Sequence, residues 1–261
     1  MAADAPAGQA GWVASVPMPL RSVLAVRRSD PGDAMVELSV RPWMGSTLAA
    51  AAILADDVLG LAATTKLPLG YLSLTAELTV DAVGPLGQGM PASLLAGARA
   101  VAIDSEAGTV TTSGTIEDGS GASLVLISAR SVIVERASGA DPVEGASTDA
   151  REPEETSVPS RALPYFSNPM QRVHGGVLAA IGATAAERAL APLPLTGLRI
   201  FFARPAPVDG KEIEAATDVL YSGRRSALAR VSVGSRPGAV SALVTASAVG
   251  ETTDPQGGTD E

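Results

Sequence analysis

Cysteine is absent from this chain of 261 residues, and histidine occurs only once, at position 174. Without cysteine there can be no disulfide, no thiolate nucleophile and no cysteine-bound metal. A metal site would need carboxylates alone, and no group of carboxylates has the spacing of a known ligand set. The absence of cysteine is compatible with a reducing compartment, and we expect a cytoplasmic protein.

Positive charge and long apolar runs are also scarce. The chain has 19 basic against 28 acidic residues, a formal net charge of -9. Such a balance argues against nucleic acid and anionic membranes as partners. The longest charge-free apolar run, residues 44–55, is too short to span a bilayer. Residues 1–17 lack the basic and apolar segments of an export signal, so they are predicted to form a flexible leader.

Several catalytic motifs are missing as well. The chain has no Gly-x-Ser-x-Gly elbow, which argues against a serine hydrolase on an α/β fold. It has neither a phosphate-binding loop with lysine nor a dinucleotide-binding fingerprint. Nucleotide hydrolysis and nicotinamide chemistry are therefore not expected.

What the chain does contain is a repeated order of elements. Residues 34–40 alternate like a half-buried strand, and residues 48–64 are apolar on nearly every side, which predicts a buried helix. An acidic, proline-bearing stretch at 137–157 is typical of a linker, and the same order then returns. We predict a leader at 1–17, domains at 18–136 and 158–250, and a flexible tail at 251–261. Strands are expected at 71–83, 93–103, 108–117, 123–135, 196–204, 212–222, 226–235 and 239–249.

This order predicts an α+β fold in which each long helix is wrapped by its own antiparallel sheet. Segments 75–85 and 195–205 align, and a proline closes each of them. The two halves therefore look like copies of one unit.

The stretch from Asn168 to Leu190 contains the most distinctive motif. Pro169 predicts a loop, and His174-Gly175-Gly176 leads directly into a run of helix-forming residues. The start of a helix presents free amide donors and the positive end of its dipole. We expect an anion to be bound there, such as the oxyanion of a reaction intermediate.

Asn168 followed after five residues by His174-Gly175-Gly176 resembles the signature of hotdog-fold acyl-CoA thioesterases of the phenylacetyl-CoA thioesterase (PaaI-like) type. Residues 54–60 resemble that family's Leu-Ala-Asp helix segment. The resemblance covers roughly residues 18–136 and 158–250. It implies two tandem hotdog domains packed as a pseudo-dimer that hydrolyse an acyl-CoA, with coenzyme A as part of the substrate and no other cofactor. It also allows for a homodimer of such chains.

The family places a carboxylate nine residues beyond the histidine, facing the Asn and His-Gly loop of the partner unit. Here that position is Ala183, so the second half has the loop without the carboxylate. The first half has Asp56, but residues 47–49 stand where His-Gly-Gly would be. The losses are complementary, and we expect one complete site in which Asp56 meets the loop of the other half.

Within that site, Asp56 is expected to act as general base or nucleophile, and the amides of His174 and Gly175 as oxyanion donors. Asn168 would position water or the carbonyl group, and the resemblance places a helping hydroxyl at Thr75. The remaining candidates are for binding coenzyme A: Gly176, the hairpin residues Gly223, Arg224 and Arg225, and Arg204 as a second choice.

Each assignment has a structural alternative. Asp57 could be the working carboxylate, although about 100° separates neighbouring helix residues and both cannot then face one way. Glu187 could supply a displaced carboxylate, and Asn168 could serve only to stabilise its turn. The two loop glycines could be required for close helix packing, the histidine ring could be inert, and the hairpin arginines could simply be solvated. The alternative function is a non-catalytic acyl-CoA-binding or scaffolding protein.

Overall fold

The computed structural model describes residues 18–84, 86, 89–135, 150–155, 158, 160–235 and 238–250. The predicted leader, most of the predicted linker and the predicted tail lie outside these residues. The strands are β1 (Leu24–Asp30), β2 (Asp33–Ser39), β3 (Tyr71–Ala82), β4 (Ser93–Asp104), β5 (Thr109–Asp118), β6 (Ser123–Glu135), β7 (Leu195–Phe202), β8 (Glu214–Ser222), β9 (Ser226–Gly234) and β10 (Val240–Val249). The helices are α2 (Thr47–Lys66) and α3 (Gly175–Leu190), with short 3-10 turns η1 (Pro19–Ser22), η2 (Pro42–Met44) and η3 (Pro164–Phe166).

The strands form one ten-stranded antiparallel sheet in the order β1-β2-β4-β5-β6-β3-β7-β10-β9-β8. The prediction of a separate sheet for each helix was therefore wrong. The two sheets are continuous because β3 pairs with β7, the two segments whose sequences align. Thr79 pairs with Arg199 at the middle of this junction, and each residue lies 120 positions from the other.

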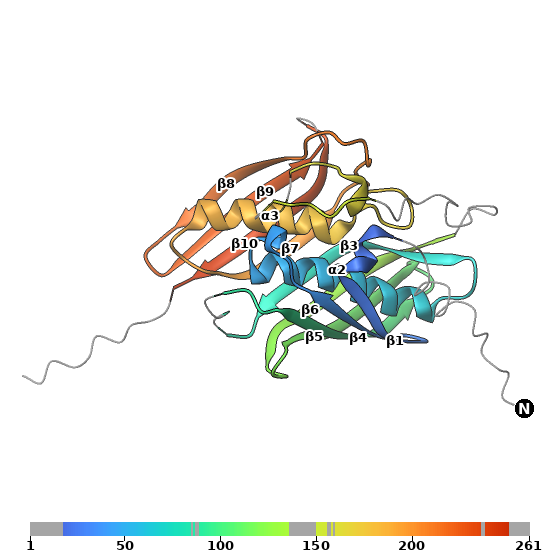
Figure 1. The fold of residues 1–261 in the computed structure, drawn as a ribbon. Coiled ribbons are helices and arrows are strands. Elements are labelled where there is room, and N and C mark those ends of the chain that lie inside the picture. The colour runs from blue at the N-terminus through green and yellow to red at the C-terminus, as the bar shows by residue number, and fades with distance from the viewer. Residues whose placement is uncertain are drawn as a thin grey trace, which may run out of the picture.

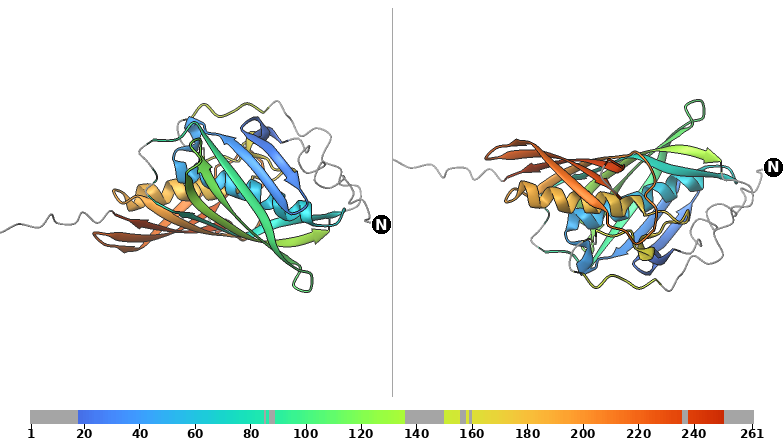
Figure 2. Two further views of the ribbon diagram at one scale, coloured as in Figure 1. Left: turned by 90° about the horizontal axis from the view of Figure 1, so that it is seen from below. Right: turned by 90° about the horizontal axis from the view of Figure 1, so that it is seen from above.

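Each helix packs against the strands of its own half, α2 against β1 to β6 and α3 against β7 to β10. The helices also pack against each other, as Figure 1 shows. Seen from above and below, the strands of the first half curl around α2 (Figure 2).

The helices and strands predicted from the sequence are confirmed, whereas β1 was not predicted. Its side chains are mostly outside the core, so it has little apolar pattern of its own, and its pairing with β2 holds it in place.

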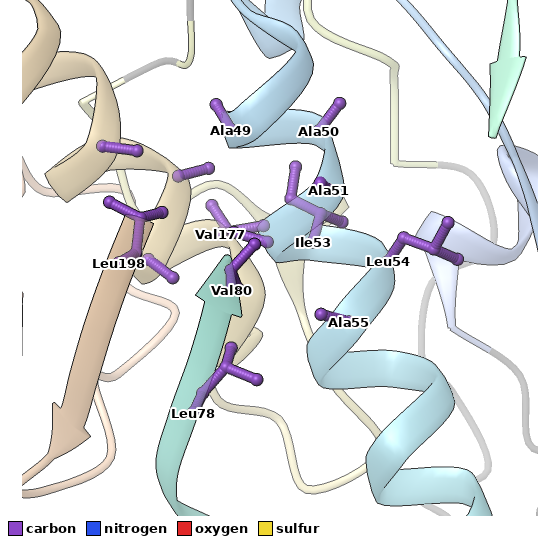
Figure 3. Close-up of a cluster of buried hydrophobic side chains, with 14 of the residues drawn as sticks. Ala49, Ala50, Ala51, Ile53, Leu54, Ala55, Leu78, Val80, Val177 and Leu198 are labelled. Carbon is purple, nitrogen blue, oxygen red and sulfur yellow. The ribbon is translucent and has the colours of Figure 1, made fainter. Parts of the chain in front are cut away.

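Helix α2 is long and apolar enough to cross a membrane by length and composition, but 89% of that apolar window is buried inside the protein. Helix α2 is therefore the core helix of the first half. A buried cluster joins the two helices to the central strands (Figure 3): Ala49, Ala50, Ala51, Ile53, Leu54, Ala55, Leu78, Val80, Val177 and Leu198.

The start of α3 lies very close to the middle of α2. A Cβ added at Gly176 would lie 2.6 Å from the Ile53 Cα and 2.9 Å from the Ala52 carbonyl oxygen. Only glycine permits this approach, which confirms for Gly176 the helix-packing alternative. The approach also brings the loop before α3 against Asp56, which lies one turn further along α2.

Candidate active site

Asp56 and the first turn of α3 are in direct contact. Asp56 Oδ2 accepts a hydrogen bond from the Gly176 N–H at 2.8 Å and lies 3.2 Å from His174 Nδ1. The Asp56 side chain is only 10% exposed. The carboxylate of the first half therefore meets the loop of the second half, as the sequence analysis expected.

The His174 ring lies between two carboxylates. Nδ1 faces Asp56 Oδ2 at 3.2 Å, and Nε2 faces Asp57 Oδ1 at 3.8 Å. Burial lowers the pKa of His174, but the hydrogen bond to Asp57 and the charges of Asp56 and Asp57 outweigh it and hold that pKa above 6.5. The Gly176 N–H, which donates to Asp56 Oδ2, also donates to His174 Nδ1 at 3.1 Å, so the His174 ring is the N-cap of α3.

This arrangement corrects the expectation that only one aspartate could face the site. Both Asp56 and Asp57 line the same cavity, and the imidazole ring of His174 lies between them with a different nitrogen facing each carboxylate. Asp57 is nevertheless distinct, since its Oδ2 accepts a hydrogen bond from Arg21 Nη1 at 2.8 Å. Burial raises the pKa of Asp57, but Arg21 and His174 together lower it to about 2.

Arg21 comes from η1, and sequence reasoning missed it. The signal in the sequence was an aspartate within an apolar helix, because a buried carboxylate requires a cationic partner. The sequence cannot show which arginine supplies it, because η1 is 36 residues away along the chain.

The oxyanion donors need a second correction. The His174 N–H donates to the Phe166 carbonyl oxygen at 2.8 Å, and the Gly176 N–H donates to Asp56. Neither amide is available to a substrate. Within the described part of the chain, the Gly175 N–H has no hydrogen-bond acceptor, so it is the donor that remains.

Asn168 closes the loop before α3. Its Oδ1 accepts hydrogen bonds from the N–H groups of Met170 and Arg172, both at 3.0 Å. These bonds support the turn-stabilising alternative for its side-chain oxygen. Asn168 still lines the cavity, so only its amide nitrogen can serve a bound substrate.

These residues open onto a cavity of about 640 Å³ between the two halves. Asp56, Asn168, His174 and Gly175 line it, together with Thr75 from β3. The structure thus brings together the five residues predicted to be catalytic. Their chemical roles remain predictions.

The residues predicted to bind coenzyme A are not brought to this cavity. Gly176 is buried under α2, and the hairpin of Gly223, Arg224 and Arg225 lies between β8 and β9. The Arg225 carbonyl accepts from Gly250, beside the C-terminal end of α3. A helix of 16 residues spans about 24 Å, so the hairpin lies at the end of α3 opposite to the loop.

Two other arginines line the cavity at exposed positions, Arg172 and Arg204. Arg204 was the second choice of the sequence analysis, and its guanidinium is held by the carbonyl oxygens of Val240 and Gly238 at 2.9 and 3.2 Å. Arg172 was missed, although it lies within the Asn168 loop. Its position two residues before His174 was a signal that could have been used.

The start of α2, where it faces α3, differs from the start of α3, where it faces α2. Ser46 is the N-cap of α2, and its hydroxyl donates to Glu187 Oε1 at 2.5 Å. Burial raises the pKa of Glu187, against the opposing effects of Ser46 and Arg188. Ala183 is fully buried, and Glu187 does not line the cavity that contains Asp56. Within the described residues, no group of three or more potential ligands could hold a metal ion.

Acid should destabilise the protein through Asp57. A carboxylate with a folded pKa of about 2, below the ordinary 3.8, contributes stability above about pH 4 that is lost as the pH falls towards 2. The shift corresponds to about 2 kcal/mol. The free energy of unfolding in urea should decrease by this amount in the wild type between about pH 6 and about pH 2.5. In Asp57→Asn the decrease over the same pH range should be smaller. An equal loss in the variant would contradict the assignment.

Residues 164–249 match the family model described as the acyl-CoA thioesterase N-terminal domain. This match identifies a thioester hydrolase, which confirms the class of enzyme predicted from the sequence. No curated protein sequence matches the chain.

Solved structures show the fold. A conserved protein of unknown function with a hot dog fold from Alicyclobacillus acidocaldarius is 14% identical, with a TM-score of 0.57 over 92% of this chain and 100% of its own. An acyl-CoA thioesterase II from Mycobacterium marinum is 13% identical, with a TM-score of 0.52 over 91% and 100%. A 12:0-ACP thioesterase from Umbellularia californica is 9% identical, with a TM-score of 0.53 over 83% and 93%. The chain therefore has a hotdog fold, whereas the phenylacetyl-CoA type remains a prediction.

Proposed function

We propose that this protein hydrolyses an acyl-CoA thioester at a single site between two tandem hotdog halves. One observation carries the proposal: the Asp56 carboxylate of the first half contacts the first turn of α3 on the wall of a cavity of about 640 Å³. The match to an acyl-CoA thioesterase domain supports the substrate class.

The register of the sheet supports the tandem arrangement. The sequence alignment makes Thr79 equivalent to Arg199, and these two residues pair with each other at the junction. Antiparallel pairing of equivalent residues is what a twofold axis produces. We infer that the halves are duplicated units related by a pseudo-twofold axis through this pair.

Asp56 is proposed to act as a general base. Oδ2 is held by the Gly176 N–H and His174, whereas Oδ1 accepts no hydrogen bond within the described residues. Oδ1 would take a proton from a water molecule as the water oxygen bonds to the thioester carbon. The carbonyl oxygen becomes an oxyanion facing the Gly175 N–H and the dipole of α3. Collapse breaks the carbon–sulfur bond, and the departing thiolate receives the proton from Asp56.

The residues that line the cavity suggest how the substrate lies. Arg172 and Arg204 are exposed cations of an otherwise acidic protein, and this part of the lining, here called the cationic arm, suits the phosphates of coenzyme A. Leu61, Leu72 and Val132 also line the cavity, and this apolar part, here called the acyl arm, suits an acyl group. The reacting carbonyl would then lie between the arms, beside Asp56.

Release of free thiol from acyl-CoAs tests the proposal, and Gly175→Ala tests the site. An alanine Cβ at 175 would lie 2.8 Å from Asp56 Oδ2, so the carboxylate must move. A displacement of this size should lower kcat about a hundredfold. The melting temperature checks that the fold survives. If wild-type protein binds acyl-CoA without releasing thiol, the scaffolding alternative holds instead.

A further inference from the structure

Helix α2 contains a glycine that the packing of the protein does not explain. Gly60 lies inside the helix, six residues before it ends at Lys66, so it is not a C-terminal cap. A Cβ added at Gly60 would meet nothing within 4 Å. Glycine inside a helix costs stability relative to alanine, because its backbone loses more freedom on folding.

The glycines of α3 have packing reasons that Gly60 lacks. An added Cβ would lie 2.6 Å from the Ile53 Cα at Gly176, and 2.5 Å from the Val244 Cγ2 at Gly182. A side chain is excluded there by neighbouring atoms. At Gly60 the space is open, and the residue lines the cavity.

Gly60 also has a defined place relative to the reacting groups. Asp56, Gly60 and Thr64 follow one another at intervals of four residues, so they share one face of α2, and all three line the cavity. With a rise of 1.5 Å per residue, Gly60 lies about 6 Å beyond Asp56 and Thr64 about 12 Å beyond it. The far end is marked by the hydroxyls of Thr64 and Ser73, which are 2.7 Å apart and also line the cavity.

We propose that Gly60 determines substrate specificity: its missing side chain keeps the acyl arm of the cavity open, so that the protein takes acyl groups of medium length such as octanoyl. This inference rests on the proposed function and adds the class of acyl group. An acetyl group ends before Gly60, whereas an octanoyl group must pass over it. A very long chain would meet the Thr64–Ser73 pair.

The test compares Gly60→Leu with wild-type protein in thiol release from acetyl-CoA, octanoyl-CoA and palmitoyl-CoA. Wild type should prefer octanoyl-CoA. Gly60→Leu should lose about 10- to 200-fold in kcat/KM for octanoyl-CoA, the range that misfitting methylene groups produce in an apolar pocket. The value for acetyl-CoA should change less than about threefold, because that acyl group does not reach the new side chain.

Binding of two thioethers, S-ethyl-CoA and S-octyl-CoA, separates this inference from the proposed function because thioethers cannot be hydrolysed. Wild type should bind the octyl compound more tightly, and Gly60→Leu should remove that preference. If thiol is released but Gly60→Leu alters both chain lengths equally, or neither, the specificity inference fails while the function stands. If no thiol is released yet the octyl preference is lost in the variant, the function fails while the binding arm stands.

Two alanine variants test whether the glycine is structural. Gly60→Ala should raise the melting temperature by about 2 °C and reduce octanoyl-CoA turnover only slightly. Gly182→Ala, the matched control in the other helix, should lower the melting temperature because its Cβ overlaps Val244. A lower melting temperature for Gly60→Ala would overturn the inference, including in the case that Gly60→Leu does not fold.

Discussion

Asp56→Asn is expected to lower kcat for thiol release by about 10²- to 10⁴-fold, the contribution of a general base. Asparagine has the shape of aspartate but cannot take a proton from water. Its side-chain oxygen can still accept the Gly176 N–H, which Asp56 Oδ2 accepts at 2.8 Å. The fold should therefore survive while the chemistry is lost. Detection of free thiol by a chromogenic disulfide gives the rate.

The control for this variant is its affinity for a substrate analogue. Asp56→Asn should bind S-octyl-CoA within a few-fold of wild type and should melt at a similar temperature. Such a result would show that the change affects the reaction and not the cavity. If Asp56→Asn keeps more than a tenth of wild-type kcat, another group is the base, and Asp57 is the next candidate because it lines the same cavity.

Asp57→Asn should instead reduce stability by about 3 kcal/mol. Asp57 is 6% exposed and Arg21 is 20% exposed, so removing the carboxylate leaves a largely buried cation without its partner. Breaking a buried pair from one side typically costs 3–5 kcal/mol, and the partial exposure of Arg21 places the expected cost at the lower end. The free energy of unfolding in urea at neutral pH measures it.

The double variant Arg21→Met, Asp57→Asn is the matched control. Removing both charges leaves no unpaired ion, so it should be more stable than Asp57→Asn alone. Activity that is lost in both variants reflects the loss of the contact between Asp57 and His174, whose Nε2 lies 3.8 Å from Asp57. If Asp57→Asn is as stable as wild type, the Arg21–Asp57 ion pair makes no net contribution to the free energy of unfolding.

Local pattern was enough to predict the helices and most strands. Residues 48–64 are apolar all round, and such a helix must be buried whatever surrounds it. Strand β1 was missed because its charged side chains, such as Arg27 and Arg28, give no alternation. The continuity of the sheet was also missed, because backbone pairing between β3 and β7 has no signature in either strand alone.

The pairing of Asp56 with the His174 loop could be predicted from the family resemblance, because each half lacks the part of that family's site that the other retains. The role of each amide could not, because hydrogen bonds from His174 to Phe166 and from Gly176 to Asp56 depend on how the loop is packed. The position of the hairpin candidates for coenzyme A, which do not line the cavity, could not be predicted for a similar reason. Their charge is visible in sequence, but their distance from the loop is set by the length of α3.

The amino-acid sequence by itself determined the buried helices, the alternation of the strands and the residue types available for chemistry, because these depend on short-range periodicity and composition. The tertiary structure alone decided which donor stays free for an oxyanion, which arginine neutralises Asp57 and which helix glycine faces open space. Such properties arise where segments far apart in the chain meet, and the distances between those segments are set by packing that one-dimensional pattern does not record.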